Sequence, residues 1–275
     1  MSFSYQVTDG ITAVTDSATL DITPFSAPTQ KAPDFDFSGD GQSDILWQNG
    51  NGTAAVWTMN GTGVSSFGPP LSNPGTSWHV IDANDFDRDH KADILWQNDN
   101  GASAVWLMNG VNVVNEGPAL PNPGPSWHAK EAADFNADGK ADILWQNEKG
   151  TAAVWLMDGV NVMNEGLALP NPGPSWHVKD AADFNGDGKA DILWQNDNGT
   201  AAVWLMDGVN VVNEGPGLPN PGPSWHAIAA GDFNADGKAD ILWQNDSGAA
   251  AVWLMDGTGV LARVRRCKIP APPGT

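Results

Sequence analysis

Apolar residues in this chain come in short runs, and Gly, Pro, Asn and Asp separate one run from the next. In one representative stretch the runs cover residues 176–182, 192–196, 201–206 and 209–212. Runs of this length between turn residues predict β-strands. The second and third runs are apolar at successive positions instead of alternate ones, which predicts strands that are covered on both faces.

The four runs return with a period of 49 residues, as from Asp85 to Asp134, and five copies follow one another. Four short strands per repeat with turns between them are typical of a β-propeller blade. We therefore predict an all-β fold, a β-propeller of four-stranded blades, with five blades as the first choice. Tryptophans recur in the second and third runs, and we interpret them as core between blades. Those of the second run are Trp47, Trp96, Trp145, Trp194 and Trp243.

Each repeat carries one acidic loop between its first and second runs. The loops open at Asp36, Asp85, Asp134, Asp183 and Asp232, and the last three read D-F-N-[AG]-D-G-K-A-D. An oxygen ligand at every second position, with Gly at position six, is how a short loop wraps a hard cation. The pattern predicts calcium, about five ions at one per loop.

Other readings of the loop can be tested against its spacing. An EF-hand or a dockerin needs an acid at position 12, where these loops have Trp, and an EF-hand needs flanking helices, whereas these flanks predict strands. Both readings fail. A loop of Asp caps and turns without a metal remains as the alternative.

The sequence D-x-[ND]-x-D-G-x-x-D followed at once by Ile-Leu-Trp resembles the FG-GAP, or VCBS-type, repeat of integrin-α-like calcium-binding β-propellers. This resemblance implies that side-chain oxygens of loop positions 1, 3, 5 and 9 and the carbonyl of position 7 bind calcium. It also leaves part of a seven-bladed ring as an alternative to five blades. The implied side-chain ligands are Asp36, Ser38, Asp40, Asp44, Asp85, Asp87, Asp89, Asp93, Asp134, Asn136, Asp138, Asp142, Asp183, Asn185, Asp187, Asp191, Asp232, Asn234, Asp236 and Asp240.

Two loops depart from this pattern. Ser38 supplies a hydroxyl where Asn or a carboxylate is usual, and His90 replaces the Gly that turns the loop. We therefore expect the last three loops to fill before the first two, although Asp87 adds a charge that partly compensates in the second loop.

The two ends of the chain differ from the repeats. Residues 3–7 and 18–22 predict two strands, which resemble the last strands of cadherin-like or immunoglobulin-like modules in large bacterial surface proteins. The predicted division is residues 1–24 for that truncated module, 25–33 for a linker, 34–264 for the propeller and 265–275 for an irregular tail.

The formal charge of −20 argues against nucleic acid as a partner, and no run is apolar enough to predict membrane insertion. One cysteine excludes an intramolecular disulfide. Weak calcium loops need extracellular calcium, yet the first residues lack the features of a secretory signal. We therefore expect an extracellular or cell-surface location, in a bacterium, as part of a longer exported protein; export by another signal is the alternative. The oligomeric state stays open.

A second set of residues collects on the rim opposite the acidic loops, because alternate turns of an antiparallel sheet leave on opposite edges. Indole, imidazole and amide groups there suit a sugar, which stacks on Trp and bonds to His and Asn. Structural packing of the Trp-His pairs is the alternative. The candidate ligand contacts are Trp78, His79, Trp127, His128, Asn147, Trp176, His177, Asn196, Trp225, His226 and Asn245.

These observations favour a calcium-stabilised binding module with multivalent, lectin-like recognition of a glycan or a cell-surface protein. The alternatives are an adhesin or scaffold propeller without a small ligand, and an accessory domain of a secreted hydrolase. Catalysis needs one asymmetric constellation, whereas the repeats are nearly copies, so we do not expect an enzyme.

Overall fold

The computed structural model of the chain describes residues 2–8, 13–19 and 35–267. It contains two compact units, Met1–Lys31 and Ala32–Thr275. In the first unit, β1 (Ser2–Thr8) pairs antiparallel with β2 (Ala13–Thr19). Two strands are therefore present as predicted, but the second begins earlier than expected. The resemblance to a cadherin-like or immunoglobulin-like module stays a prediction, and the linker at 25–33 lies outside the described residues.

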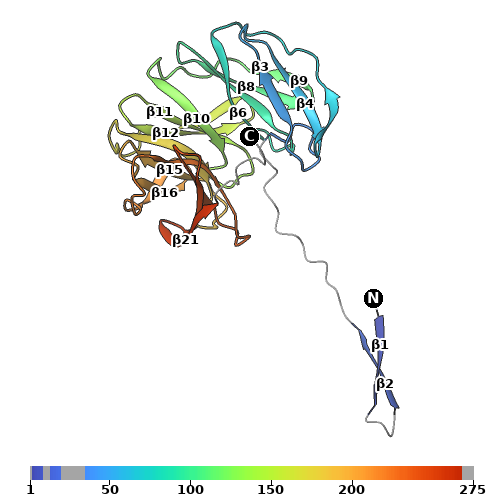
Figure 1. Ribbon diagram of the computed structural model, residues 1–275. Coiled ribbons are helices and arrows are strands. Elements are labelled where there is room, and N and C mark those ends of the chain that lie inside the picture. The colour runs from blue at the N-terminus through green and yellow to red at the C-terminus, as the bar shows by residue number, and fades with distance from the viewer. Residues whose placement is uncertain (1, 9–12, 20–34, 268–275) are drawn as a thin grey trace, which may run out of the picture. The chain divides into compact units, whose positions relative to one another are not determined.

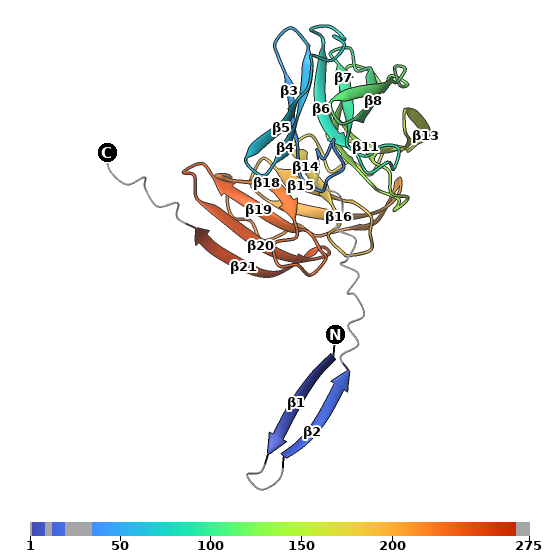
Figure 2. The ribbon, with the colours of Figure 1, turned by 90° about the vertical axis from the view of Figure 1, so that its right-hand side faces the viewer.

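The second unit is a five-bladed β-propeller in which each repeat forms one antiparallel sheet (Figures 1 and 2). Four blades have four strands, and the first has three among the described residues. The first strands of the blades are β6 (Trp78–Asn84), β10 (Trp127–Ala133), β14 (Trp176–Ala182) and β18 (Trp225–Gly231). The second strands are β3 (Ile45–Gln48), β7 (Asp93–Asn98), β11 (Asp142–Asn147), β15 (Asp191–Asn196) and β19 (Asp240–Asn245).

The outer half of each blade completes the sheet. The third strands are β4 (Ala54–Asn60), β8 (Ser103–Asn109), β12 (Ala152–Asp158), β16 (Ala201–Asp207) and β20 (Ala250–Asp256). The fourth strands are β5 (Gly63–Phe67), β9 (Asn112–Glu116), β13 (Asn161–Glu165), β17 (Asn210–Glu214) and β21 (Gly259–Cys267). Each strand pairs with its neighbour in the chain, and β6, β10, β14 and β18 contact one another in chain order. The first strands therefore form the inner edge of the propeller.

Successive blades share their cores. Phe135, Leu144 and Val154 of the third blade pack against Ile192 and Trp194 of the fourth, and equivalent residues form the other three junctions. Each of the three interior sheets is thus covered on both faces, which is why β7, β11 and β15 lack apolar alternation. This confirms the interpretation of the second-run tryptophans as core for Trp96, Trp145, Trp194 and Trp243, which are 0–1% exposed.

A glutamine side chain, buried in three of the four cases, ties each of the first four blades to the next one. Gln97 Nε2 donates to the carbonyl of Trp127 at 2.8 Å, and its Oε1 accepts the N–H of Ala129 at 3.1 Å. Gln48, Gln146 and Gln195 make the same pair of bonds. These side chains therefore bond to backbone groups of the following first strand, which lies at the edge of its sheet.

Within residues 35–267, the first and last blades have one uncovered face each. Trp47 is 48% exposed, although its counterparts are buried, and Phe233 is 51% exposed. The prediction that Trp47 is core is therefore wrong, because no described blade packs on its side of the first sheet. Among the described residues, the first and fifth sheets share no strand.

The C-terminal boundary also differs from the prediction. The irregular tail was expected from residue 265, but β21 continues to Cys267, which pairs with Ala250. The backbone ladder of the fifth blade thus extends over the basic segment, and Arg263 stacks on Trp253 at 4.7 Å. No helix in the described part of the chain is long and apolar enough to cross a membrane.

Candidate metal centre and ligand rim

The first carboxylate of each acidic loop holds the loop in shape. Asp85 Oδ1 accepts the N–H of Arg88 at 2.6 Å, and its Oδ2 accepts the N–H of His90 at 2.8 Å. Asp36 and Asp183 accept the equivalent N–H groups in their own loops. The loop fold is therefore built from Asx-type turns, and a metal would bind to a shape that is already formed.

Two loop positions have left-handed backbone. Position six was predicted to need Gly, and His90 does adopt that conformation, with φ of 65°. Position four is left-handed as well, with φ of 67° at Arg88, 62° at Ala137 and 61° at Ala235. The sequence contained a signal for this in Gly39 and Gly186, which stand at position four in the other two loops.

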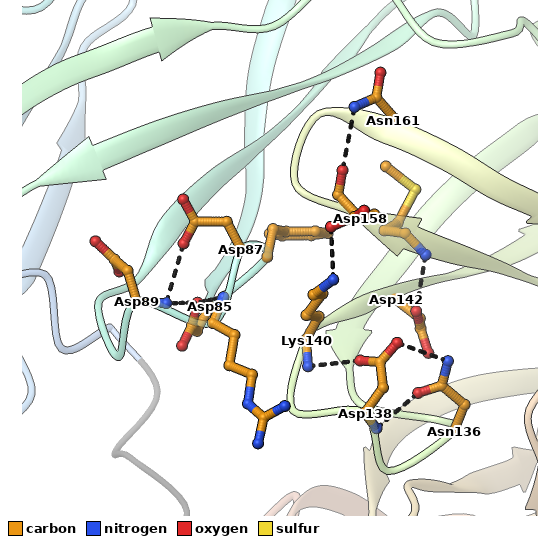
Figure 3. Close-up of polar contacts among 12 residues, drawn as sticks. Asp85, Asp87, Asp89, Asn136, Asp138, Lys140, Asp142, Asp158 and Asn161 are labelled. Carbon is orange, nitrogen blue, oxygen red and sulfur yellow. Dashed lines mark hydrogen bonds and ion pairs between the residues drawn. The ribbon is translucent and has the colours of Figure 1, made fainter.

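Three carboxylates converge in the second loop. Asp85, Asp87 and Asp89 each offer one oxygen, and these oxygens lie within 4.8 Å of one another (Figure 3). Within residues 35–267, this is the one group of three acids found that could hold a metal ion. Asp87 is half-buried and Asp89 is exposed, so an ion could enter from solvent.

The third, fourth and fifth loops differ because position three is Asn. Asn136 Nδ2 donates to Asp138 Oδ2 at 3.0 Å, and Asn136 Oδ1 accepts the N–H of Asp138 at 2.9 Å (Figure 3). Asn185 and Asn234 make the same contacts. The amide thus relieves carboxylate repulsion in these loops, whereas Asp87 has no hydrogen to donate. In the first loop, Ser38 Oγ donates to Asp36 Oδ1 at 3.3 Å.

The partner of the lysine at loop position seven also distinguishes the second loop from the three that follow it. Lys140 pairs with Asp158 at 2.6 Å, and Lys189 pairs with Asp207 at 2.7 Å. The second repeat has Asn109 at this place in its third strand, and Lys91 instead pairs with Asp89 at 3.3 Å. One cation therefore already lies against the cluster, and an incoming metal ion would compete with it.

The carboxylate at position nine fastens each loop to the third strand. Asp93 Oδ2 accepts the N–H of Phe86 at 2.9 Å, and Oδ1 accepts the N–H of Met108 at 2.8 Å. Burial raises the pKa of Asp93 to about 8, although these two hydrogen bonds act to lower it. Burial likewise raises the pKa of Asp142 and Asp191 to about 7. Position nine therefore has a structural role in every repeat, and its part in metal binding stays a prediction.

All predicted metal ligands lie in their own loops on one rim, together with the turns that follow the third strands. The backbone shows this arrangement, because Ala141 N donates to the carbonyl of Asp85 and Gly159 N donates to that of Phe86. Each of the first four loops is thus hydrogen-bonded to the next blade. The sorting of loops onto two rims is confirmed, whereas calcium binding stays a prediction at all five loops, including the second, where three carboxylates converge.

On the opposite rim, each predicted histidine faces an acid of its own blade. His79 lies 2.8 Å from Asp99, and His177 and His226 have equivalent partners in Asp197 and Asp246 at 2.8 and 2.7 Å. His128 is further from Glu148, at 3.9 Å. The imidazoles are about half exposed, so a ligand can reach these pairs.

One cavity on this rim joins two repeats. It has a volume of about 110 Å³ and is lined by His128, Asn147, Trp176 and His177, together with Lys130 and Glu148. Four of the predicted contacts of the third and fourth blades therefore come together here, whereas Trp127 and Asn196 do not line this cavity. The volume is below the range of typical small-molecule pockets, which fits a shallow site for part of a ligand.

Other candidates on this rim have structural contacts. Asn196 Nδ2 donates to Ser175 Oγ at 2.8 Å, and Asn196 Oδ1 accepts the N–H of Asn198 at 3.0 Å. Asn245 has the same environment. Trp78, Trp127, Trp176 and Trp225 are half-buried and pack on the blade cores. Ligand binding by these residues stays a prediction.

A family model described as an FG-GAP-like repeat matches residues 36–96, 85–145, 134–194 and 183–243. No curated protein matches the chain. Among solved structures, the C-terminal WD40 domain of Sif2 is similar with a TM-score of 0.48 and 15% identity, over 86% of this chain and 74% of that one.

Two further structures are similar over 81% of this chain. One is the computationally designed Ika8 protein, with a TM-score of 0.43, 13% identity and 59% of its length covered. The other is the dihydro-heme d1 dehydrogenase NirN in complex with DHE, with a TM-score of 0.43, 11% identity and 43% of its length covered.

Proposed function

The chain belongs to the FG-GAP-like repeat family, and we propose that it is a calcium-stabilised extracellular binding module. The observation that supports this proposal is the convergence of Asp85, Asp87 and Asp89 in a loop that is already shaped by its own hydrogen bonds. Carboxylates around one point repel one another, and calcium, which prefers such oxygen ligands, removes the repulsion. We extend the proposal to the other four loops, which gives about five ions.

Magnesium is a poorer fit to this loop. It demands near-ideal octahedral geometry at short distances and keeps its water, whereas calcium accepts irregular sets of carboxylate and carbonyl oxygens. An exposed loop suits weak calcium binding, in the range of about 10⁻⁴–10⁻³ M that is typical of extracellular modules, so we place the protein outside the cell or on its surface.

Calorimetric titration of the EDTA-treated protein tests the proposal. We expect several calcium ions to bind with millimolar or tighter affinity and magnesium to bind more weakly. Asp87→Asn gives the second loop the Asn of the third loop, so it is a matched variant; we expect it to change one site only. Absence of calcium binding to the folded wild-type protein would refute the proposal.

We propose a glycan as the partner of the opposite rim, because of the cavity that joins His128, Trp176 and His177 across two blades. An indole face beside an imidazole and a carboxylate offers both stacking and hydrogen bonds to a sugar. The repetition of His–acid pairs in four blades suits weak contacts that combine into avidity, with binding and no catalysis as the role.

A glycan array with and without EDTA tests this second proposal. Replacing His128, His177 and His226 together by Ala should abolish glycan binding and leave the calcium-dependent melting unchanged. Leu167→Ala is a control, since Leu167 is 86% exposed and lies outside the cavity. If no glycan binds the folded protein, the adhesin or scaffold role replaces this proposal.

A further inference from the structure

The two uncovered faces of the propeller are the two halves of one interface. At each internal junction, one half consists of Phe, Leu and Val side chains of the preceding blade, and the other consists of Ile, Trp, Trp and Met of the following blade. We name the uncovered half of the fifth blade the C-face, formed by Phe233, Leu242, Gln244 and Val252. The uncovered half of the first blade is the N-face, formed by Ile45, Trp47, Trp57 and Met59.

Exposure follows this division. Phe37, Phe86, Phe135 and Phe184 are fully buried, whereas Phe233 on the C-face is 51% exposed. Leu242 and Val252 are only partly buried, although their counterparts Leu193 and Val203 are 0% exposed. On the N-face, Trp47 is 48% exposed, and Ile45, Trp57 and Met59 are partly buried. Exposed apolar side chains that lie together on one face mark a candidate interaction surface.

Polar groups follow the same pattern. Gln195 bonds to the carbonyl of Trp225 and the N–H of Ala227, but its counterpart Gln244 on the C-face is exposed. The carbonyls of Asp183 and Phe184 accept the N–H groups of Ala239 and Gly257 from the following blade. The C-face therefore offers a hydrogen-bonding pattern, as well as an apolar surface, that a blade of this same chain satisfies at each internal junction.

We propose that the C-face of one molecule binds the N-face of a second copy through the contacts that join successive blades within the chain. The occupant is a second copy because an interface that forms four times between successive blades has both its halves uncovered, among the described residues, on the first and fifth blades. Such contacts are heterologous, head to tail, so every molecule uses one face for each neighbour.

One contact in the N-face must change when the second copy binds. Gly61 N donates to Gln42 Oε1 at 2.9 Å, whereas Gly110, Gly159, Gly208 and Gly257 at the same place donate to the preceding blade. Gln42 stands where the other loops have Lys. This side chain caps the N-face and must turn aside, so Gln42→Ala should strengthen the association.

Sedimentation velocity over a concentration series tests the proposal with two charge variants. Trp47→Glu removes the N-face and Phe233→Glu removes the C-face, so each variant alone should be monomeric. A mixture of the two still holds one intact C-face and one intact N-face. We expect the mixture to form a dimer and no larger species, while the wild type forms dimers and longer assemblies. Leu167→Glu, an exposed site outside both faces, should assemble like the wild type.

Circular dichroism checks that each variant is folded. If Phe233→Glu does not fold, Gln244→Glu takes its place, because Gln244 is exposed and its replacement removes only the polar part of the C-face. A wild type that stays monomeric at its highest soluble concentration would overturn the proposal. So would folded variants whose mixture stays monomeric, or a Leu167→Glu variant that loses assembly to the same extent as Phe233→Glu.

Discussion

Interior and terminal blades share one sequence pattern but differ in what covers them. Trp194 is fully buried between the third and fourth blades, whereas Trp47 occupies the same place in the first blade and is 48% exposed. Phe184 and Phe233 differ in the same way at the other end. The environment of a residue in a repeat protein is therefore set by the neighbouring repeat as much as by its own sequence.

The same difference extends to the acidic loops. The loop at Asp183 is covered in part by the fifth blade, which donates two N–H groups to its carbonyls, while most of the loop at Asp232 is exposed. Burial raises the pKa of Asp85, whereas at Asp232 the effect of burial is outweighed by backbone N–H groups acting together, and the pKa is lowered. The loops of the first four blades are thus hydrogen-bonded to a neighbouring blade, whereas the loop at Asp232 has no such neighbour among the described residues.

The largest difference between interior and terminal blades should come from removing two equivalent tryptophans, Trp194 and Trp47. Trp194→Ala leaves a cavity between two blades and should cost about 3–5 kcal/mol of the free energy of unfolding. Trp47→Ala removes a half-exposed side chain and should cost about 1 kcal/mol in the monomer. Denaturant unfolding of both variants, at a concentration where the wild type is monomeric, measures the difference; equal losses would contradict the account of the two ends.

Removal of the bridging glutamine should have the next largest effect. Gln195→Ala leaves the carbonyl of Trp225 and the N–H of Ala227 without partners, which should cost about 2 kcal/mol. Gln244→Ala removes an exposed side chain and should change stability by less than about 0.5 kcal/mol. Thermal unfolding of the two variants compares them, and a larger loss for Gln244→Ala would break the comparison.

The pH dependence of the EDTA-treated protein should come mainly from the interior blades. Because burial raises the folded-state pKa of Asp93 to about 8 and that of Asp142 to about 7, the folded state binds protons more tightly than the unfolded chain. Their stabilising effect is complete below the unfolded pKa and is lost as the pH rises through these values. The melting temperature should therefore fall by a few degrees between mildly acidic and mildly alkaline pH.

A matched pair of variants assigns this pH effect. Asp142→Asn should flatten the pH profile more than Asp240→Asn, since burial raises the pKa of Asp240 in the terminal blade without a large shift. A profile that rises with pH, or an equal flattening by both variants, would contradict the assignment.

The smallest effect on stability should come from glycine substitutions at loop position four, and it should be the same in interior and terminal blades. Ala137 and Ala235 have φ of 62° and 61° at loop position four, so Ala137→Gly and Ala235→Gly should each stabilise the protein by about 0.5–1 kcal/mol. This backbone strain belongs to the loop itself and not to its neighbours. Unequal gains in chemical denaturation would show that the next blade also sets the loop conformation.

Much of this architecture follows from the sequence because each blade is specified locally. The first strand was predicted at residues 176–182 and is observed there, since Trp-His at one end and an acidic loop at the other fix its limits. The rim of each loop follows from the alternation of hairpin turns. Periodicity cannot tell which repeat lies at an uncovered end, so Trp47 was placed in the core.

The directions of the loop side chains also could not be predicted from the sequence. Asn136 was predicted to direct an oxygen toward a metal, and in the structure its amide bonds to Asp138. Gln97 lies in the run equivalent to residues 192–196, for which only a strand was predicted, yet its side chain is buried and joins two blades. Both outcomes depend on distances between backbone groups that only the folded sheet sets.

The measurement that tests the central claim most directly is the thermal unfolding of the EDTA-treated protein with and without millimolar calcium. If calcium relieves the repulsion of Asp85, Asp87 and Asp89, the melting temperature should rise, by an amount equivalent to about 2–3 kcal/mol when calcium exceeds its dissociation constant a hundredfold. Equal magnesium should produce a much smaller rise. An unchanged melting temperature in calcium would contradict the claim that this propeller is stabilised by calcium.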